Sequence, residues 1–194
     1  MNPLKIINKN LNDHLAILKK DKKILQEKVI FLSNKIIRCF ENNGKILIFG
    51  NGGSAADAQH FATELTVRLK KNRRALPAIS LATDTSCLTA IGNDLGFKNI
   101  FKRQIEALAN YNDLIIPIST SGNSNNILEA VKFCKKKKLF TFGILGNKGG
   151  KTNSYFENHY IVGSNNPSRI QEVHVIFWQT VCEVVENYYA FKKS

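Results

Sequence analysis

Apolar residues change their spacing along the chain at about residue 44. Over residues 3–43 they recur at steps of three and four, which is typical of amphipathic helices. Lys22 and Lys23 interrupt the pattern, so it predicts a pair of helices. The first of these has no strand pattern beside it. We expect its apolar face to pack against a partner, such as another subunit.

From residue 45 onward, short apolar runs alternate with segments of helical pattern, and the last helical segment covers about 168–189. Such alternation predicts a parallel β-sheet with helices on both faces, a three-layer α/β sandwich. Pro117 argues against a central, fully hydrogen-bonded position along the whole of its strand. The expected strands are 45–50, 78–82, 114–118, 139–145 and 159–162.

Length and composition fit one soluble domain. A chain of 194 residues supports one sizeable core, and no linker divides it, so we expect a single domain over 1–194, with helices in 1–43 and the core in 44–194. No apolar run approaches the roughly 18 residues of a membrane span, and the N-terminus lacks a signal-peptide core. We expect a cytoplasmic protein whose four widely spaced cysteines are reduced.

The net charge of +13 is concentrated in lysine- and arginine-rich runs at 19–23, 70–74 and 135–138. Such runs can bind nucleic acid by releasing counterions. These runs lack interleaved aromatic residues, and solvated helix ends account for them equally well. We therefore expect neither specific nucleic-acid binding nor membrane association.

The segment 50–65 joins an expected strand to an expected helix through a glycine-rich turn. Ser54 is suited to cap this helix, whose N-terminus would favour an anionic or polyhydroxylated ligand. On the same helix, His60 and Glu64 are four residues apart and share one face. They are a candidate metal or acid–base pair, although a surface pair has the same spacing.

A hydroxyl-rich turn follows the expected strand 114–118. Four of its six residues carry hydroxyl groups, and it leads into a helix. A helix cap needs only one such residue, so the excess favours a phosphate site at the helix N-terminus. Nucleotide-binding glycine motifs are absent. The candidate phosphate ligands are Ser119, Thr120, Ser121 and Ser124.

The final helix offers further polar side chains. Gln179 lies eight residues after Gln171, so the two project to roughly the same side of a helix. The same helix carries Glu172 and His174. Amide oxygen, imidazole and carboxylate groups together could coordinate zinc. Spacing alone does not tell whether the two helices meet.

Five segments of the chain resemble the sedoheptulose 7-phosphate isomerases (phosphoheptose isomerases) of the sugar-isomerase (SIS) family. The resemblance implies a flavodoxin-like SIS fold and a homotetramer with active sites between subunits. It also implies a phosphosugar substrate and one zinc ion per subunit. The segments are 50–65, Thr83-Asp84, 91–94, 119–124 and 169–174.

The same resemblance assigns roles to individual residues. Glu64 matches the family's base, which moves a proton between C1 and C2 of the sugar. The zinc ligands carried over are His60, Glu64 and Gln171, with Gln179 at the position of the fourth. Phosphate would be bound by the four hydroxyl residues above. The residues expected to contact the sugar are Asn51, Gly52, Gly53, Asn93, Asp94 and Gln171.

Gln179 departs from the family pattern, which has at this position a histidine that is both acid–base group and zinc ligand. An amide has no proton to exchange near neutral pH. Losing a general acid or base lowers the rate by about 10²–10⁴-fold. His174 is a poor substitute, because five residues along a helix turn its side chain about 140° away.

This departure leaves two functions open. The first is an aldose–ketose isomerase that converts sedoheptulose 7-phosphate into an aldoheptose 7-phosphate for surface polysaccharide (lipopolysaccharide) synthesis. The second is a weak or inactive adaptor similar to the replication-initiator-associating proteins, which lack the same histidine and bind a protein partner. Those proteins also depart at the position of Glu64, which this chain keeps. We therefore favour the isomerase.

Overall fold

The computed structural model describes residues 2–192 and contains one sheet of five parallel strands in the order β2-β1-β3-β4-β5. Every neighbouring pair is parallel, which confirms the α/β sheet expected from the alternating pattern. The strands are β1 (Ile46–Gly50), β2 (Ala78–Ser80), β3 (Leu114–Ser119), β4 (Phe140–Gly146) and β5 (Asn158–Val162).

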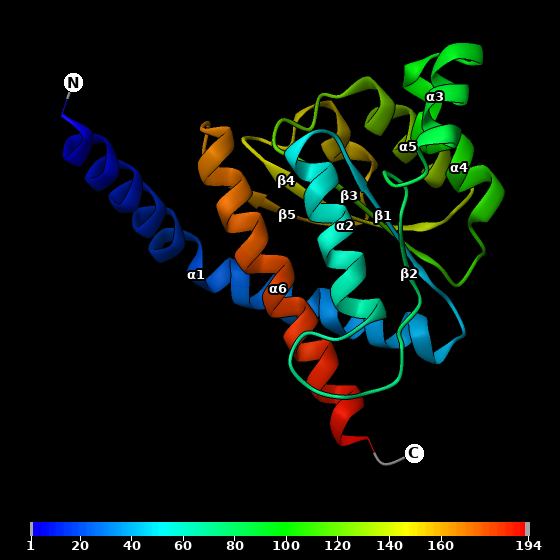
Figure 1. The fold of residues 1–194 in the computed structure, drawn as a ribbon, viewed down its shortest axis with the longest axis horizontal. Coiled ribbons are helices and arrows are strands. Elements are labelled where there is room, and N and C mark those ends of the chain that lie inside the picture. The colour runs from blue at the N-terminus through cyan, green and yellow to red at the C-terminus, as the bar shows by residue number, and fades with distance from the viewer. Residues whose placement is uncertain (1, 193–194) are drawn as a thin grey trace.

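Helices cover both faces of this sheet and complete three layers (Figure 1). Ile46 and Ile48 of β1 point into one core, and Leu47 and Phe49 point into the other, as the two-residue period of a strand requires. The first core is closed by α1 (Pro3–Glu41), α2 (Gly53–Thr66) and α6 (Pro167–Phe191). The second is closed by α3 (Thr85–Asp94), α4 (Ile100–Leu108) and α5 (Asn125–Lys136), with short turns η1 (Phe97–Asn99) and η2 (Gly150–Tyr155) nearby.

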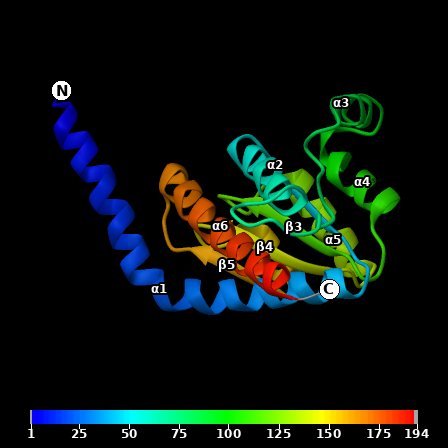
Figure 2. The same cartoon turned by 60° about the horizontal axis from the view of Figure 1, so that its bottom comes forward.

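The N-terminal region is one helix of 39 residues, which corrects the expected pair of helices. The helix bends without breaking, so its first part projects away from the sheet (Figure 2). The first buried residue is Asp21, whose carboxylate accepts the N–H of Gly163 at 3.3 Å. Ile17 and Leu18 still pack against the core, but closer to the N-terminus the apolar side chains are largely exposed within the single chain. Leu4, Ile7, Leu11 and Leu15 are 50–66% exposed.

Pro117 lies in β3, the middle strand of the sheet. The pairing of β3 with β1 is continuous, but its pairing with β4 passes from Ile115 to Ile118. Proline has no N–H to donate, so the sheet interrupts one of its two ladders here. Pro117 thus interrupts the pairing with β4, as expected, but β3 is nevertheless the central strand of the sheet.

Within residues 2–192, no helix combines the length and the apolar character needed to span a membrane. All four cysteines are free thiols, and Cys39, Cys134 and Cys182 are buried. Burial raises the pKa of Cys134 to about 12. These thiols belong to the packed interior, in keeping with the expectation of reduced cysteines.

Candidate active site

The β1–α2 turn begins the site. Helix α2 starts at Gly53 with Gly52 as its N-cap at a φ of 55°, and no side chain caps it. Ser54 is therefore not the cap that the sequence suggested: it is 4% exposed, and its backbone and side chain lie against Gly50. With Gly52 at a positive φ as the N-cap, the helix begins two residues earlier than a Ser54 cap would place it, and Ser54 lies inside the first turn.

Gln171 of α6 reaches this same turn. A Cβ atom added to Gly53 would lie 2.5 Å from Nε2 of Gln171, so only glycine allows the amide to approach. The structure thus brings together two residues, Gly53 and Gln171, that the sequence placed separately as sugar contacts. Helices α2 and α6 lie side by side on the same face of the sheet (Figures 1 and 2).

The hydroxyl-rich turn joins β3 to α5. The Oγ of Ser119 accepts the N–H of Gly122 at 3.0 Å, and the Oγ of Ser121 accepts the N–H of Asn123 at 3.2 Å. Ser124 occupies the N-cap of α5 without making a side-chain cap bond. The turn is therefore folded by two of its hydroxyls, while the Ser124 hydroxyl and the helix N-terminus remain available to an anion.

A second glycine-rich turn, at residues 146–150, supports the first. Gly122 has a φ of 63°, and a Cβ atom there would lie 1.9 Å from the carbonyl oxygen of Gly149. The N–H of Thr152 donates to the carbonyl of Gly122 at 3.0 Å, and the N–H of Lys151 donates to Asn123 Oδ1 at 3.0 Å. The expected phosphate turn is thus held rigidly in place.

Asn51 and Asn126 connect the two binding turns. Each amide donates to the other's oxygen, at 2.9 and 2.8 Å, and Asn126 is 3% exposed. This pair fixes the β1–α2 turn to the first turn of α5. Sequence reasoning named Asn51 but missed Asn126, whose only signal was a polar residue in the first turn after Ser124.

His60 and Glu64 lie within hydrogen-bonding distance of each other, as their spacing on the helix allows. His60 Nε2 lies 2.9 Å from Glu64 Oε1, with side chains 51% and 16% exposed. The His60 ring also packs edge-on against Trp178 of α6, with centroids 4.9 Å apart. Gln179 follows Trp178 and is half-buried. The two helices therefore meet at the level of this pair.

Within one chain the candidate residues form three separate groups: the two binding turns with Gln171, the His60–Glu64 pair, and the end of α3. Glu64 lies eleven residues after Gly53 on α2, which corresponds to about 16 Å along a helix. Asn93 and Asp94 end α3 on the opposite face of the sheet and are exposed, with Asn93 Nδ2 donating to Asp94 Oδ1 at 2.8 Å. The single chain does not gather the whole expected site.

Two further titratable groups lie near the site. Asp57 had no role in the sequence-based prediction, and His174 was rejected there as a substitute for the missing histidine. Burial raises the pKa of Asp57 to about 6, against the opposing effect of His60 one turn further on. Its Oδ2 atom is buried without a hydrogen-bond partner in residues 2–192. Burial lowers the pKa of His174 to about 4, although its Nε2 pairs with the Leu145 carbonyl at 2.9 Å. His174 is thus a neutral core residue.

The donor set does not fit a zinc site. In the described part of the chain, no three His, Cys, Asp or Glu side chains are grouped as metal ligands. Zinc sites in proteins take three or four such donors. Here the expected set is one imidazole, one carboxylate and the amides of Gln171 and Gln179, and the Gln171 amide lies against Gly53, two turns from His60.

Comparison with known proteins agrees with this fold. The SIS domain pattern matches residues 11–146, so the chain belongs to the SIS domain family. Within that family, its relatives are phosphoheptose isomerases. One from Aliarcobacter butzleri is 48% identical over 90% of this chain and 92% of its own. Another, from Helicobacter pylori strain P12, is 47% identical over 96% of this chain and 97% of its own.

Solved structures of phosphoheptose isomerases share this fold. The phosphoheptose isomerase GmhA from Neisseria gonorrhoeae has a TM-score of 0.89 at 36% identity, covering 96% of this chain and all of its own. A phosphoheptose isomerase from Francisella tularensis has a TM-score of 0.92 at 32% identity, with the same coverage. The likeness extends over the bent N-terminal helix as well as the sheet.

Proposed function

We propose that the protein is an aldose–ketose isomerase that converts sedoheptulose 7-phosphate into an aldoheptose 7-phosphate. The observation that carries this proposal is the identity of 44–49% to phosphoheptose isomerases over nearly the whole chain. The proposal is also supported by the presence of Glu64, which pairs with His60, and of the hydroxyl-rich turn, which is folded by its own hydrogen bonds.

The phosphate is proposed to bind at the N-terminus of α5. Ser119, Thr120, Ser121 and Ser124 supply hydroxyls there, and the helix dipole favours the negative charge. Asn51, Gly52 and Gly53 line the adjoining turn, where Gln171 offers an amide to the sugar hydroxyls. Asn93 and Asp94 are proposed to contact the sugar from α3. Remote binding of this kind orients the reacting carbons.

Glu64 is proposed to move the proton. Its carboxylate takes a proton from C1 of the ketose and returns it to C2, while a proton moves from O1 to O2, so that the enediol collapses to the aldose. The neighbouring imidazole of His60 orients the carboxylate at 2.9 Å. The side chain of Gln179 is an amide and cannot act as a general acid, so we expect turnover to be slower than in an enzyme with histidine at this position.

The resemblance implied a zinc ion, but the proposed proton transfer includes no step that uses it. His60 and Glu64 are the side chains that would hold it, with the amide oxygens of Gln171 and Gln179 as weak additional donors. Because amide oxygens suit harder cations than zinc, we propose that this chain binds zinc weakly.

A homotetramer with sites shared between subunits is proposed for this chain. Its support is the separation of the three groups of candidate residues within one chain, together with the exposed apolar side chains near the start of α1. In this proposal the product supplies the heptose of surface polysaccharide, in the cytoplasm. The adaptor alternative has the Gln179 substitution in its favour, and it predicts no turnover.

The test is conversion of sedoheptulose 7-phosphate by purified wild-type protein, Glu64→Gln and Gln179→His. Turnover by the wild type that Glu64→Gln abolishes, with faster turnover by Gln179→His, is the expected result. A wild type that is inert with and without zinc, while Gln179→His is active, would favour the adaptor.

A further inference from the structure

Glu64 lies at an unfavourable place on its helix. Helix α2 ends at Thr66, so the carboxylate is in the last turn. The last carbonyls of a helix lack partners within the helix, and their partial negative charge opposes a nearby anion. Because helix ends also fray, a base in the last turn needs support from outside α2 to keep a fixed position.

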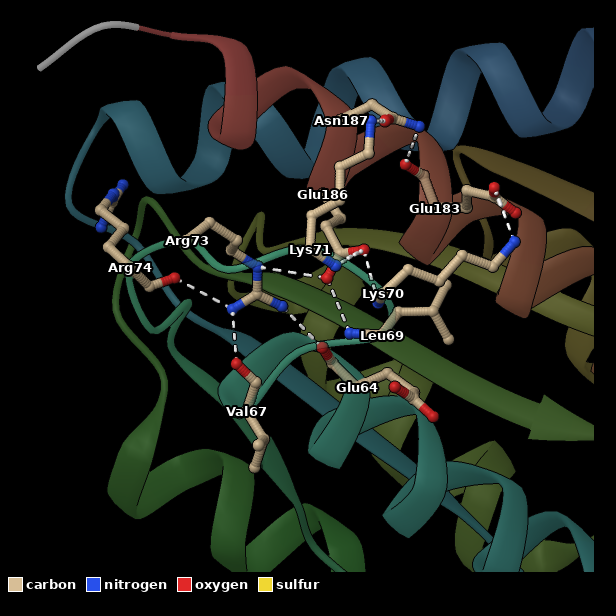
Figure 3. A network of polar contacts seen from close by, with 10 residues as sticks. All are labelled: Glu64, Val67, Leu69, Lys70, Lys71, Arg73, Arg74, Glu183, Glu186 and Asn187. Atoms are coloured by element: carbon tan, nitrogen blue, oxygen red, sulfur yellow. Dashed lines mark hydrogen bonds and ion pairs between the residues drawn. The ribbon is translucent and has the colours of Figure 1, made fainter.

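Arg73 gives that support from the loop after α2. Its Nη2 donates to the backbone carbonyl of Glu64 at 2.6 Å, and its Nη1 donates to the carbonyls of Val67 at 3.2 Å and Arg74 at 2.9 Å. The side chain is only 1% exposed. One guanidinium therefore closes the end of α2 onto the following loop (Figure 3).

Glu186 of α6 fixes the same loop from the other side. Its carboxylate accepts the N–H groups of Leu69 at 2.7 Å, Lys70 at 2.7 Å and Lys71 at 3.0 Å, and it lies 4.0 Å from Nε of Arg73 (Figure 3). Although burial opposes ionisation, the three N–H groups and Arg73 lower the pKa of Glu186. The carboxylate is thus an ionised anchor, 2% exposed, for the loop that carries Arg73.

We propose that Arg73 and Glu186 are positioning residues for the reaction: together they lock the last turn of α2 to α6 and so hold Glu64 where it reaches the substrate. This inference rests on the proposed role of Glu64 as the base. Neither residue needs to touch the sugar. Displacement of a reacting group by about 1 Å can lower the rate by about 10²-fold, so small movements of this turn matter.

A neighbouring pair on the same two elements provides a matched control. Lys70 and Glu183 also join the loop to α6, at 2.8 Å, but their side chains are 61% and 45% exposed. Exposed ion pairs contribute little to structure. Glu183→Gln and Glu186→Gln are therefore the same chemical change, one turn apart on α6, with different expected effects.

The experiment measures kcat and KM for sedoheptulose 7-phosphate in Arg73→Lys, Glu186→Gln and Glu183→Gln. Lysine keeps the charge but loses the guanidinium's fork of donors. We expect kcat to fall by about 10- to 100-fold in the first two variants with KM changed less than about twofold, and Glu183→Gln to match the wild type. In a Glu64→Gln background, Arg73→Lys should cause no further loss.

A wild-type kcat in folded Arg73→Lys and Glu186→Gln would overturn the inference, as would a loss that appears mainly in KM. Amide hydrogen exchange of the same proteins tests positioning without turnover. We expect faster exchange at residues 64–71 in Arg73→Lys and unchanged exchange at 119–126; a uniform increase would contradict it. If the wild type is inert, the proposed function fails while the exchange result still decides the positioning role.

Discussion

Among single residues, Gln179 is expected to have the largest consequence for the chemistry, because it places an amide where the resemblance implies an ionisable ligand. It is half-buried and follows Trp178, whose ring packs on His60. A histidine at this position would therefore enter the contact between α2 and α6 close to the His60–Glu64 pair.

Gln179→His is expected to increase zinc binding. The substitution adds a third side chain of a type that zinc prefers, beside His60 and Glu64. Metal analysis after dialysis against a weak chelator measures the effect. Thr180→His is the matched control, since residue 180 is exposed on the next position of α6. Equal zinc retention in both variants would show that position 179 does not face the pair.

Gly122→Ala is expected to damage the phosphate turn. The added Cβ would lie 1.9 Å from the Gly149 carbonyl oxygen, at a φ of 63° that alanine adopts with strain. We expect KM for the phosphosugar to rise by about tenfold or more, since a displaced turn loses phosphate contacts worth at least about 1.4 kcal/mol.

Gly163→Ala serves as its control. A Cβ atom at Gly163 would meet its nearest neighbour at 3.7 Å, an ordinary contact, and its KM should stay close to that of the wild type. A Gly122→Ala enzyme with unchanged KM would argue that phosphate binds elsewhere.

At the scale of elements, His174 connects α6 to the end of β4 through the Leu145 carbonyl. Its pKa falls from 6.5 to about 4 on folding, so the unfolded chain binds this proton at a higher pH than the folded one. Stability from this residue is complete above about pH 6.5 and is lost as the pH falls toward 4, by about 3 kcal/mol.

Chemical denaturation between pH 7 and pH 4 tests this slope. In His174→Gln the free energy of unfolding should be lower at pH 7 but should vary less with pH. An unchanged slope in His174→Gln would contradict the assignment.

The alternation of apolar runs was enough to predict the strands and helices of the sheet, because a buried parallel strand is recognisable by its continuous hydrophobicity. Details that depend on tertiary contacts were not predictable. The central place of β3 despite Pro117, the interior position of Ser54 and the unbroken α1 are of this kind. Arg73 also escaped notice, since within a basic run it is indistinguishable from its exposed neighbours until the fold buries it.

The candidate site was predictable in its residue types and not in its geometry. The motifs named Gly53 and Gln171 separately, and the structure places them in contact. Glu64 and the phosphate turn remain predicted parts of one site that a single chain holds apart. Residue spacing cannot reveal this, because it carries no information on where separate elements lie in space.

For the whole molecule, the projecting part of α1 is the feature that a single chain leaves unpartnered (Figure 2). Leu11 and Leu15 are 58% and 62% exposed on its apolar face. We expect Leu11→Glu/Leu15→Glu to shift the protein to smaller assemblies and to lower turnover, because the site is proposed to be completed between subunits.

Light scattering coupled to size-exclusion chromatography, run beside the isomerase assay, measures both effects. Lys19→Glu changes an exposed residue of the same helix and should leave assembly and turnover as they are. Smaller assemblies with full turnover would show that one chain carries a complete site.

The central claim is that Glu64 moves a proton between C1 and C2 although Gln179 replaces an acid. It is tested most directly by incubating sedoheptulose 7-phosphate with the wild type and Glu64→Gln in D₂O, followed by NMR of the sugar. With the wild type, the account predicts an aldoheptose 7-phosphate that carries deuterium at C2 in the fraction of turnovers in which the Glu64 carboxyl exchanges its proton with D₂O before returning it. With Glu64→Gln it predicts no aldoheptose 7-phosphate. A wild type that neither forms the aldose nor exchanges hydrogen at C1 would contradict it.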